Sequence, residues 1–259
     1  MKWQAVSVNA YREAIRDKIL YNLLIFALIL IGGSILLASL TLGEQKKIII
    51  DFGLASMNLF GVLMAIFLGI SLVSKEIERR TLYAVLSKPI GRTEFLLGKY
   101  AGLLLTLAVN MIVMCIGLYF TLMFNQFHWG LSVWDMDLRL MEAIGMIYLE
   151  LALITAVALL FSTLTTTTLA AIFTLSIYVM GHISGALMKM GEKLNGLAAL
   201  LVKGIYYALP NLSNFDIKGH VAHGVAIEPR YFLYTVSYAL VYIALLIGTA
   251  AFIFKRRDF

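Results

Sequence analysis

The sequence predicts an all-α, polytopic membrane protein with six transmembrane helices. Hydrophobic residues make up 61% of its 259 residues and charged residues only 14%, and soluble domains contain roughly 45–50% apolar residues. The apolar residues form uncharged blocks that reach the roughly 20 residues an α-helix needs to cross a bilayer. Because lipid offers the backbone no hydrogen-bond partners and the blocks lack the alternation of barrel strands, helices are the remaining spanning structure.

The apolar blocks define the expected spans, which cover about residues 20–42, 53–73, 95–124, 141–164, 169–188 and 231–254. An even number of spans places both termini on one side of the membrane. Thirteen of the 21 Lys and Arg residues fall on that side and eight on the other, and basic residues accumulate on the cytoplasmic side. We therefore expect one transmembrane domain over residues 1–259, N-in and C-in, as a multi-pass protein of the bacterial or archaeal cytoplasmic (inner) membrane.

Residues 1–19 precede the first span. Trp3, Val6, Ala10 and Ile15 fall near one face of a helix, with the charged side chains largely elsewhere, which predicts an amphipathic helix at the cytoplasmic interface. The alternative is a simple charged stop before the first span. The first apolar block is longer than the core of a signal peptide and no small-residue cleavage site follows it, so we expect it to remain as an anchor.

The loop between spans two and three, residues 74–92, contains the densest charge cluster of the chain. Glu76 lies three and four residues before Arg79 and Arg80, so these side chains can pair along one helix face. Apolar contacts are supplied by Ile77, Leu82, Val85 and Leu86. This pattern predicts a short amphipathic helix held between two spans, and the alternative is an ordinary solvated loop.

The C-terminal end of this segment is marked by Pro89, which disfavours the helical conformation of the residue before it. Gly91 permits a turn. Thr93 fits the N-cap of the third span, with Glu94 at the positive end of the helix dipole.

The run Glu76-Ile77-Glu78-Arg79-Arg80-Thr81, followed by Leu86-Ser87-Lys88-Pro89-Ile90, resembles the first cytoplasmic loop of ABC-2 type transporter permeases. The turn at 161–169, the stretch 209–215 and the terminal 255–259 are also similar to that family, particularly to the branch containing the nitrous-oxide-reductase maturation permease. Many members carry Gly where Arg80 stands. This departure concerns only local contacts, because Arg favours a helix more than Gly does.

The resemblance implies the membrane subunit of an ATP-driven ABC transporter, an exporter that works as a homodimer with two copies of a separate cytoplasmic ABC ATPase. The segment 74–92 would be the coupling helix that the ATPase grips. The implied contacts are Glu76, Glu78, Arg79, Arg80, Thr81, Tyr83, Leu86, Pro89 and Arg92, with a second contact at Ser162, Thr165 and Thr166. The sequence contains no G-x-x-x-x-G-K-[ST] motif, so we expect ATP and Mg to bind to the ATPase. We also expect no catalysis, metal or cofactor on this chain.

Glu150 lies about a third of the way into the fourth span, where an ionised carboxylate costs a few kcal/mol. It should face protein or a water-filled cavity, and it is the first candidate for a transport pathway, with Asn58 and Asn110 beside it as further candidates. The alternatives are a structural partnership with a nearby Tyr or amide and hydration near the outer interface. For the two Asn residues we favour hydrogen bonds between helices.

Small residues mark two sites of close helix approach. Gly181 and Gly185 on span five, and Gly98 and Gly102 on span three, each form a G-x-x-x-G motif. The resemblance favours Gly181 and Gly185 for the dimer interface, whereas packing within one subunit is equally compatible with the sequence.

Residues 189–230 contain apolar stretches too short to cross a bilayer, notably 194–209. We expect short helices that re-enter the membrane or lie on its outer surface, where they gate a pathway or bind an extracytoplasmic partner. The four histidines, His128, His182, His220 and His223, are interpreted as exposed loop residues, because a pair without a thiolate or carboxylate cluster is a weak metal site. Cys115 is interpreted as a packing residue.

Three hypotheses for function remain open. The first is an ABC permease, surrounded by lipid, that exports a lipid-like or small inorganic substrate. The second is a mechanotransmitting subunit that acts on an extracytoplasmic partner. The third is an ion-coupled carrier or intramembrane enzyme that uses Glu150. The net charge of +6 reflects membrane topology, so we expect no nucleic-acid partner.

Overall fold

The computed structural model describes residues 2–41, 44–78, 91–128, 138–185, 188–189, 196–223, 225 and 228–256. Within these ranges the chain is helical and contains no β-strand. The helices are α1 (Lys2–Ile15), α2 (Lys18–Ser39), α3 (Gln45–Glu78), α5 (Arg92–His128), α6 (Leu138–Leu164), α7 (Thr167–His182), α9 (Leu197–Ala208), the 3-10 turn η1 (Leu212–Phe215), α10 (Lys218–Ala222) and α11 (Pro229–Arg256).

Five of these helices, α2, α3, α5, α6 and α11, are long and apolar enough to cross a membrane. Together they confirm an all-α polytopic membrane protein. The fifth predicted span coincides with α7, an apolar helix of 16 residues that falls short of the roughly 20 residues of a typical span. The number of crossings and their orientation stay predictions.

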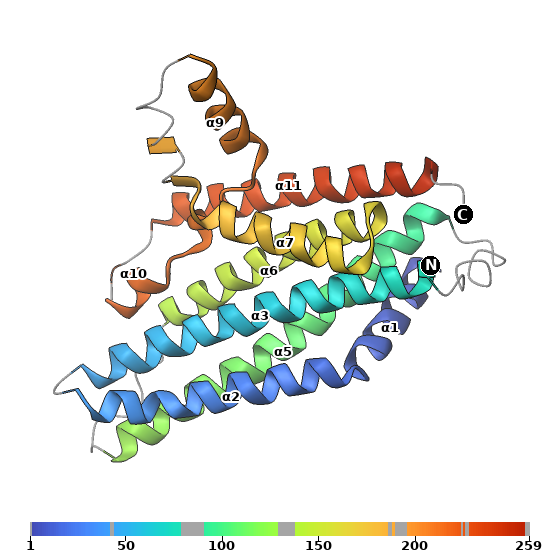
Figure 1. The fold of residues 1–259 in the computed structure, drawn as a ribbon. Helices are drawn as coiled ribbons and strands as arrows, with labels where there is room; N and C mark the ends of the chain where they lie inside the picture. The colour runs from blue at the N-terminus through green and yellow to red at the C-terminus, as the bar shows by residue number, and fades with distance from the viewer. Residues whose placement is uncertain are drawn as a thin grey trace.

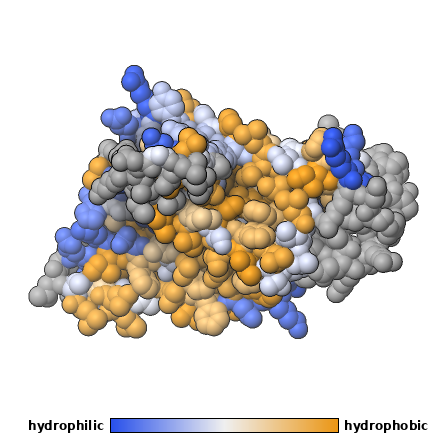
Figure 2. Space-filling model, turned by 45° about the horizontal axis from the view of Figure 1, so that its top comes forward, coloured by the Kyte–Doolittle hydropathy of each residue, from blue (hydrophilic) through white to orange (hydrophobic). Residues whose placement is uncertain are grey.

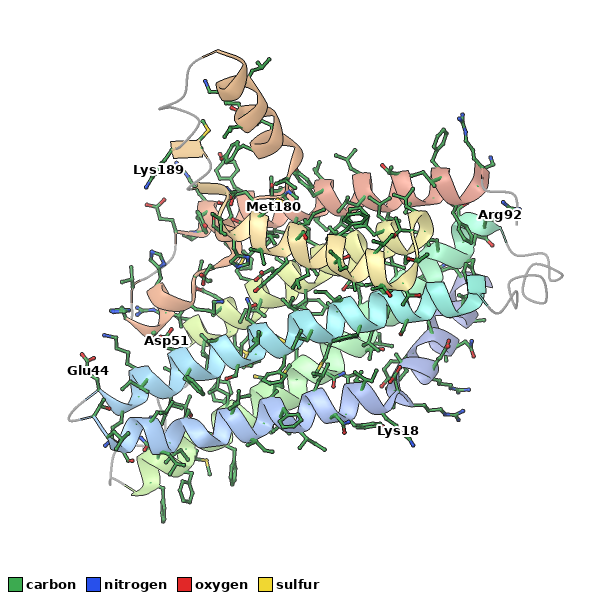
Figure 3. The ribbon with its side chains drawn as sticks, in the orientation of Figure 1. Lys18, Glu44, Asp51, Arg92, Met180 and Lys189 are labelled. Carbon is green, nitrogen blue, oxygen red and sulfur yellow. The ribbon has the colours of Figure 1, made fainter. Side chains whose placement is uncertain are left out.

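The helices run back and forth along a shared axis, so the chain has two distinct ends (Figure 1). We call the end with α1, Arg92 and Arg256 the terminal end. In Figure 3 Arg92 and Lys18 lie toward this end, whereas Glu44, Asp51 and Lys189 lie at the other, which we call the opposite end. α3 finishes and α5 starts at the terminal end, so the predicted coupling segment joins two helices there.

The helices are longer than the apolar blocks that predicted them. α3 has 34 residues and α5 has 37, which at 1.5 Å per residue is about 50 Å, more than the ~30 Å of the hydrocarbon core. α3 continues without a break through Ser74 to Glu78, into the predicted coupling segment.

The prediction that Thr93 caps α5 is wrong: the helix starts at Arg92, and the Gly91 carbonyl already accepts a hydrogen bond from Phe95 N at 3.0 Å.

α3 and α6 form the centre of the bundle. They pack closely where Gly69 on α3 meets Ala158 on α6, since a Cβ atom at position 69 would lie 2.8 Å from the Ala158 Cβ. The outer helices α2, α5 and α11 expose large apolar side chains such as Phe26, Ile116 and Leu245. Figure 2 shows hydrophobic residues across the middle of one face and hydrophilic residues toward its edges, the distribution expected of a surface in contact with lipid.

The predicted N-terminal helix exists as α1, and it packs along α5 (Figure 1). Gly98 and Gly102 on α5 make this approach close. A Cβ at Gly98 would lie 2.9 Å from the Trp3 carbonyl oxygen, and one at Gly102 would lie 2.6 Å from the Ser7 carbonyl oxygen. Val6 and Ala10 are buried in the contact, while Trp3 is 42% exposed. The G-x-x-x-G motif of the third span therefore serves packing within the chain.

At the opposite end, the segment between α7 and α11 packs partly on the bundle, whereas its helix α9 projects away from the bundle (Figure 1). It contains the short helices α9 and α10 and the turn η1, as predicted for residues 189–230. η1 packs on α6 and α7, and α10 packs on α3 and α6. Its side chains Leu212, Phe215 and Val221 are buried, so this part of the segment belongs to the core.

Candidate functional site

The first turn of α5 caps the last turn of α11 at the terminal end. Arg92 donates hydrogen bonds from its guanidinium to the carbonyl oxygens of Phe254, at 3.3 Å, and Lys255, at 3.2 Å. The last carbonyls of a helix lack intrahelical partners and carry the negative end of its dipole, so a cation there is favourable. One turn further along α5, the rings of Phe95 and Phe254 stack with centroids 6.2 Å apart.

Lys99, one turn deeper, joins α5 to α1. Its side chain is 1% exposed, and its Nζ lies 3.1 Å from Glu13 Oε2. Glu13 is 42% exposed, so the pair has one partner in the core and one at the surface. The Lys99 ammonium also lies 5.8 Å from the centroid of the Phe95 ring, within the range of a cation–π contact. Arg92, Phe95 and Lys99 thus connect α5 to α11 and α1, and we call these three residues the terminal junction.

The predicted ATPase contacts are only partly within the described residues. Arg92 starts α5, and Glu76 and Glu78 belong to the last turn of α3, with side chains outside the description. Arg79, Arg80, Thr81, Tyr83, Leu86 and Pro89 lie outside the described residues. Their role as a coupling helix stays a prediction.

The second predicted contact surrounds the turn between α6 and α7. Ser162 is buried in the last turn of α6, where its hydroxyl donates to Leu159 O at 2.7 Å. Thr165 donates to Phe161 O at 3.0 Å, and Thr166 precedes α7 with an exposed side chain. A protein at the terminal end would therefore reach Thr166 more readily than Ser162.

An apolar cavity of about 390 Å³ lies between α2, α3 and α7. Leu20, Met64 and Phe67 are among the hydrophobic side chains that line it, whereas Asp17 and Thr168 contribute polar groups. Asp17 is the N-cap of α2, with its carboxylate accepting from Ile19 N at 3.0 Å. The cavity therefore offers both an apolar wall and polar groups.

A polar cluster lies in the middle of the bundle, centred on Glu150. This carboxylate is fully buried, and its Oε2 accepts a hydrogen bond of 2.8 Å from the Asn58 side-chain amide. The Asn58 Oδ1 in turn accepts from the Tyr178 hydroxyl at 3.1 Å. The chain of hydrogen bonds runs from α7 through α3 to α6. It confirms that Glu150 faces protein, with the amide partner that the sequence offered as one alternative.

The second oxygen of Glu150 faces His182. The Oε1 atom is buried and makes no hydrogen bond within the described residues, but His182 Nε2 lies 3.4 Å from it. His182 Nδ1 lies 3.3 Å from the Tyr178 carbonyl oxygen, and the two rings are in contact. We call Asn58, Glu150, Tyr178 and His182 the buried polar cluster.

Glu150 and His182 meet because they lie at similar distances from the turn between α6 and α7. Glu150 lies 14 residues before the end of α6 and His182 lies 15 residues after the start of α7; at 1.5 Å per residue these are about 21 and 22 Å from the turn that joins the helices. Beyond His182 the chain leaves the helix, and η1 packs against its end: a Cβ at Gly181 would lie 2.8 Å from the Pro210 carbonyl oxygen.

Two expectations from the sequence change here. His182 is not an exposed loop residue: it ends α7, and its side chain is 24% exposed. Asn110 donates to Thr106 O within its own helix at 2.8 Å, so this hydrogen bond does not join two helices as expected.

Gly181 contacts Pro210 and Leu212 of the same chain, while nothing lies within 4 Å of a Cβ at Gly185. Their role in a dimer interface stays a prediction.

The sequence of this chain matches a known protein family. A family model described as ABC-2 family transporter protein matches residues 5–259. The chain belongs to the ABC-2 transporter family. No curated protein matches its sequence.

For an ABC-2 permease, the match covers every helix except the first residues of α1. Membership implies an ATPase partner in general and supports a multi-pass membrane protein. The likeness to the nitrous-oxide-reductase maturation permease branch stays a prediction. In this ABC-2 protein the terminal junction lies at the start of α5, directly after the predicted coupling segment, and the buried polar cluster lies about 21 Å from the turn between α6 and α7 by the helix rise.

Proposed function

We propose that this chain is the permease subunit of an ATP-driven exporter and that a separate ABC ATPase drives it through the segment 74–92. The observation that carries the proposal is the terminal junction, seen in a chain of the ABC-2 family. α5 follows the predicted coupling segment directly, and its first two turns are bonded to α11 through Arg92 and to α1 through Lys99. A push on the segment would therefore move α3, α5, α11 and α1 as one unit.

The remaining parts of the proposal come from the family resemblance and the charge distribution. The chain acts as a homodimer with two ATPase subunits, the terminal end faces the cytoplasm, and ATP and Mg bind to the ATPase while this chain catalyses nothing. An amphiphilic substrate agrees with the cavity between α2, α3 and α7, because it combines apolar walls with polar groups from Asp17 and Thr168.

Charge reversal at Glu76, Arg79 and Arg80 tests the coupling segment. The triple variant should lose co-purification with the ATPase, since charge-complementary contacts hold such an interface in register. Normal binding and normal ATP hydrolysis in that variant would show that the ATPase does not use this segment.

Arg92→Ala tests the junction separately. We expect the ATPase still to bind, because the other predicted contacts of the segment 74–92 remain, but substrate-stimulated ATP hydrolysis and export in reconstituted vesicles should fall several-fold as α11 loses its cap. Arg230→Ala provides the matched control, since Arg230 is an exposed Arg in the first turn of the same helix, α11, at the opposite end. Equal activity of Arg92→Ala and Arg230→Ala would show that Arg92 does not take part in coupling.

A second candidate function is mechanical transmission to an extracytoplasmic partner. It is favoured by η1 and α10, which pack against α3, α6 and α7, so movement of the bundle would be passed to residues 189–230. Vesicles that contain the permease and the ATPase alone distinguish the two candidates. ATP-dependent export in these vesicles supports the exporter, and activity that requires an added outer partner supports mechanical transmission.

A third candidate is an ion-coupled carrier or intramembrane enzyme, which the buried carboxylate of Glu150 favours. Substrate movement or turnover without nucleotide, lost in Glu150→Gln and retained in Glu142→Gln, would support it. Glu142 lies on the same helix with an exposed side chain, so it controls for the loss of a carboxylate alone.

A further inference from the structure

The contacts of His182 determine where its ring carries a hydrogen. Its Nδ1 lies 3.3 Å from the backbone carbonyl oxygen of Tyr178. As a hydrogen bond, this contact requires a hydrogen on Nδ1, because a carbonyl oxygen only accepts. In a neutral imidazole with a hydrogen on Nδ1, the other nitrogen, Nε2, is a bare acceptor. That nitrogen is the one that faces Glu150.

The contact between Glu150 and His182 therefore requires a proton. Glu150 Oε1 and His182 Nε2 are 3.4 Å apart, and Oε1 has no hydrogen bond within the described residues. Without a proton between them, a carboxylate oxygen would face a nitrogen lone pair in a site where Glu150 is fully buried, and an unpaired buried charge is costly. With one proton, the pair is either a carboxylate and an imidazolium or a carboxylic acid and an imidazole, and both forms are attractive.

With one proton the Glu150–His182 pair carries no net charge, and neighbouring groups affect which of the two residues holds that proton. His182 is the last residue of α7, where the negative end of the helix dipole stabilises a cation. Asn58 on α3 donates to the other carboxylate oxygen, and the Tyr178 hydroxyl donates to Asn58. In the segment between α7 and α11, Asp216 and Lys218 form a pair with 3.5 Å between Oδ1 and Nζ, so their charges largely offset each other near the cluster.

A metal ion fits this site less well than a proton. Zinc in proteins takes about four ligands, and Glu150 and His182 supply two. No group of three or more His, Cys, Asp or Glu residues that could hold a metal ion occurs in the described part of the chain. Access also suits a proton: Glu150 is closed off, whereas His182 is 24% exposed, so exchange with the surroundings runs through the imidazole.

We propose that Glu150 and His182 form a binding site for one exchangeable proton, and that this proton fastens the end of α7 to α6 and, through Asn58, to α3. Release of the proton leaves Oε1 and Nε2 repelling each other and loosens the end of α7 beneath η1. The fastening is present at low pH and is lost as the pH rises through release of the proton. The site goes beyond the proposed transport function, since it depends only on contacts inside the chain.

The direct test is nitrogen-15 NMR of histidine-labelled, full-length protein in lipid nanodiscs, combined with infrared spectroscopy of the Glu150 carboxyl group. We expect His182 to carry a hydrogen on Nδ1 throughout, and the imidazole and carboxyl to hold one proton between them until both change in a single step. His223 is an internal control for the Nδ1 signal, because its Nδ1 makes the same contact with Gly219 O, at 2.7 Å, on an exposed residue. A neutral His182 with its hydrogen on Nε2 would overturn the proposal.

Amide hydrogen exchange tests the fastening itself. After correction against the amides of α2, exchange at residues 178–183 should rise about tenfold as the proton leaves, the effect of losing one charge-assisted hydrogen bond. Glu150→Gln and His182→Gln should each abolish this pH dependence, and Glu142→Gln should preserve it. Persistence of the pH dependence in either folded variant refutes the proposal, and the second variant carries the test if the first does not fold.

A zinc titration separates the two ligands. Added zinc chloride should leave the His182 signals and the exchange at residues 178–183 unchanged. Stoichiometric zinc binding that is lost in both Glu150→Gln and His182→Gln would show a metal site and would overturn the proton assignment.

Discussion

Lys99 and Glu150 are the two buried charged side chains of the described chain, and the bundle holds them in different ways. Lys99 is paired with Glu13, which is 42% exposed, so the counter-charge stays in contact with the surface. Glu150 is paired with His182 and with the amide of Asn58 in the interior. The first pair is a salt bridge with 3.1 Å between its nitrogen and oxygen atoms, whereas the second depends on where one proton resides. The comparison implies that an ion pair attaches α1 to α5, whereas the attachment of α7 to α6 depends on one proton.

The largest effect is expected from Glu13→Lys, which places a second cation beside the buried Lys99. The variant should lose about 2–3 kcal/mol of stability, at the low end for a broken buried pair because Glu13 is partly solvated. Thermal unfolding in detergent measures the loss, and faster tryptic cleavage at Arg12 and Arg16 reports the release of α1. Adding Lys99→Glu to Glu13→Lys should restore at least half of the lost stability. A charge swap without any rescue would show that the two side chains do not interact.

Glu150→Ala should cost about 2 kcal/mol, because the Asn58 amide and the His182 ring lose their partner inside the bundle. The measurement is the same unfolding transition, with Glu142→Ala as the exposed control on α6. A loss no greater than that of the control would mean that the buried polar cluster contributes nothing to stability.

Glu13→Gln should cost about 1 kcal/mol. The amide can still accept a hydrogen bond from Lys99 Nζ, but the buried ammonium loses its counter-charge. The reference is Glu44→Gln, since Glu44 pairs with Lys47 at the surface and such pairs contribute little. Equal losses of stability in Glu13→Gln and Glu44→Gln would show that the charge of Glu13 does not help to attach α1 to α5.

Glu150→Gln should change stability least, by less than about 0.5 kcal/mol, in contrast to Glu13→Gln. A glutamine oxygen can accept from Asn58 while its amide donates to the bare Nε2 of His182, which reproduces the protonated form of the pair. Unfolding in parallel with Glu13→Gln is the decisive measurement. A loss above about 1.5 kcal/mol, more than a typical hydrogen bond contributes, would show that the cluster requires a permanent carboxylate charge, and the two buried sites would then be alike.

The sequence predicted the helices well but not their ends. Apolar runs mark the part of a helix that lies in lipid, because that is where charge is excluded. The same helices continue through polar residues such as Ser74 to Glu78, where hydropathy carries no signal. α7 is the reverse case: its apolar run continues to Met188, yet the helix ends at His182, and Pro210 and Leu212 lie close to Gly181 in its last turn.

The sequence predicted single residues of the candidate sites. The cost of a carboxylate in lipid indicated that Glu150 faces protein, and the resemblance to ABC-2 permeases pointed to the terminal end. The partners were not predictable, because Asn58 lies 92 residues from Glu150 and Glu13 lies 86 residues from Lys99. Side-chain pairing across such distances depends on which helices become neighbours, and hydrophobic periodicity does not encode that.

The docking of α1 on α5 has a consequence for synthesis of the protein. Glu13 leaves the ribosome 86 residues before Lys99, which at roughly 5–20 residues per second is a delay of several seconds. During that time the groove formed by Gly98 and Gly102 does not yet exist. α1 is therefore made before the surface that it packs on, and its amphipathic character suits it to lie on the bilayer surface while α2 and α3 are synthesised.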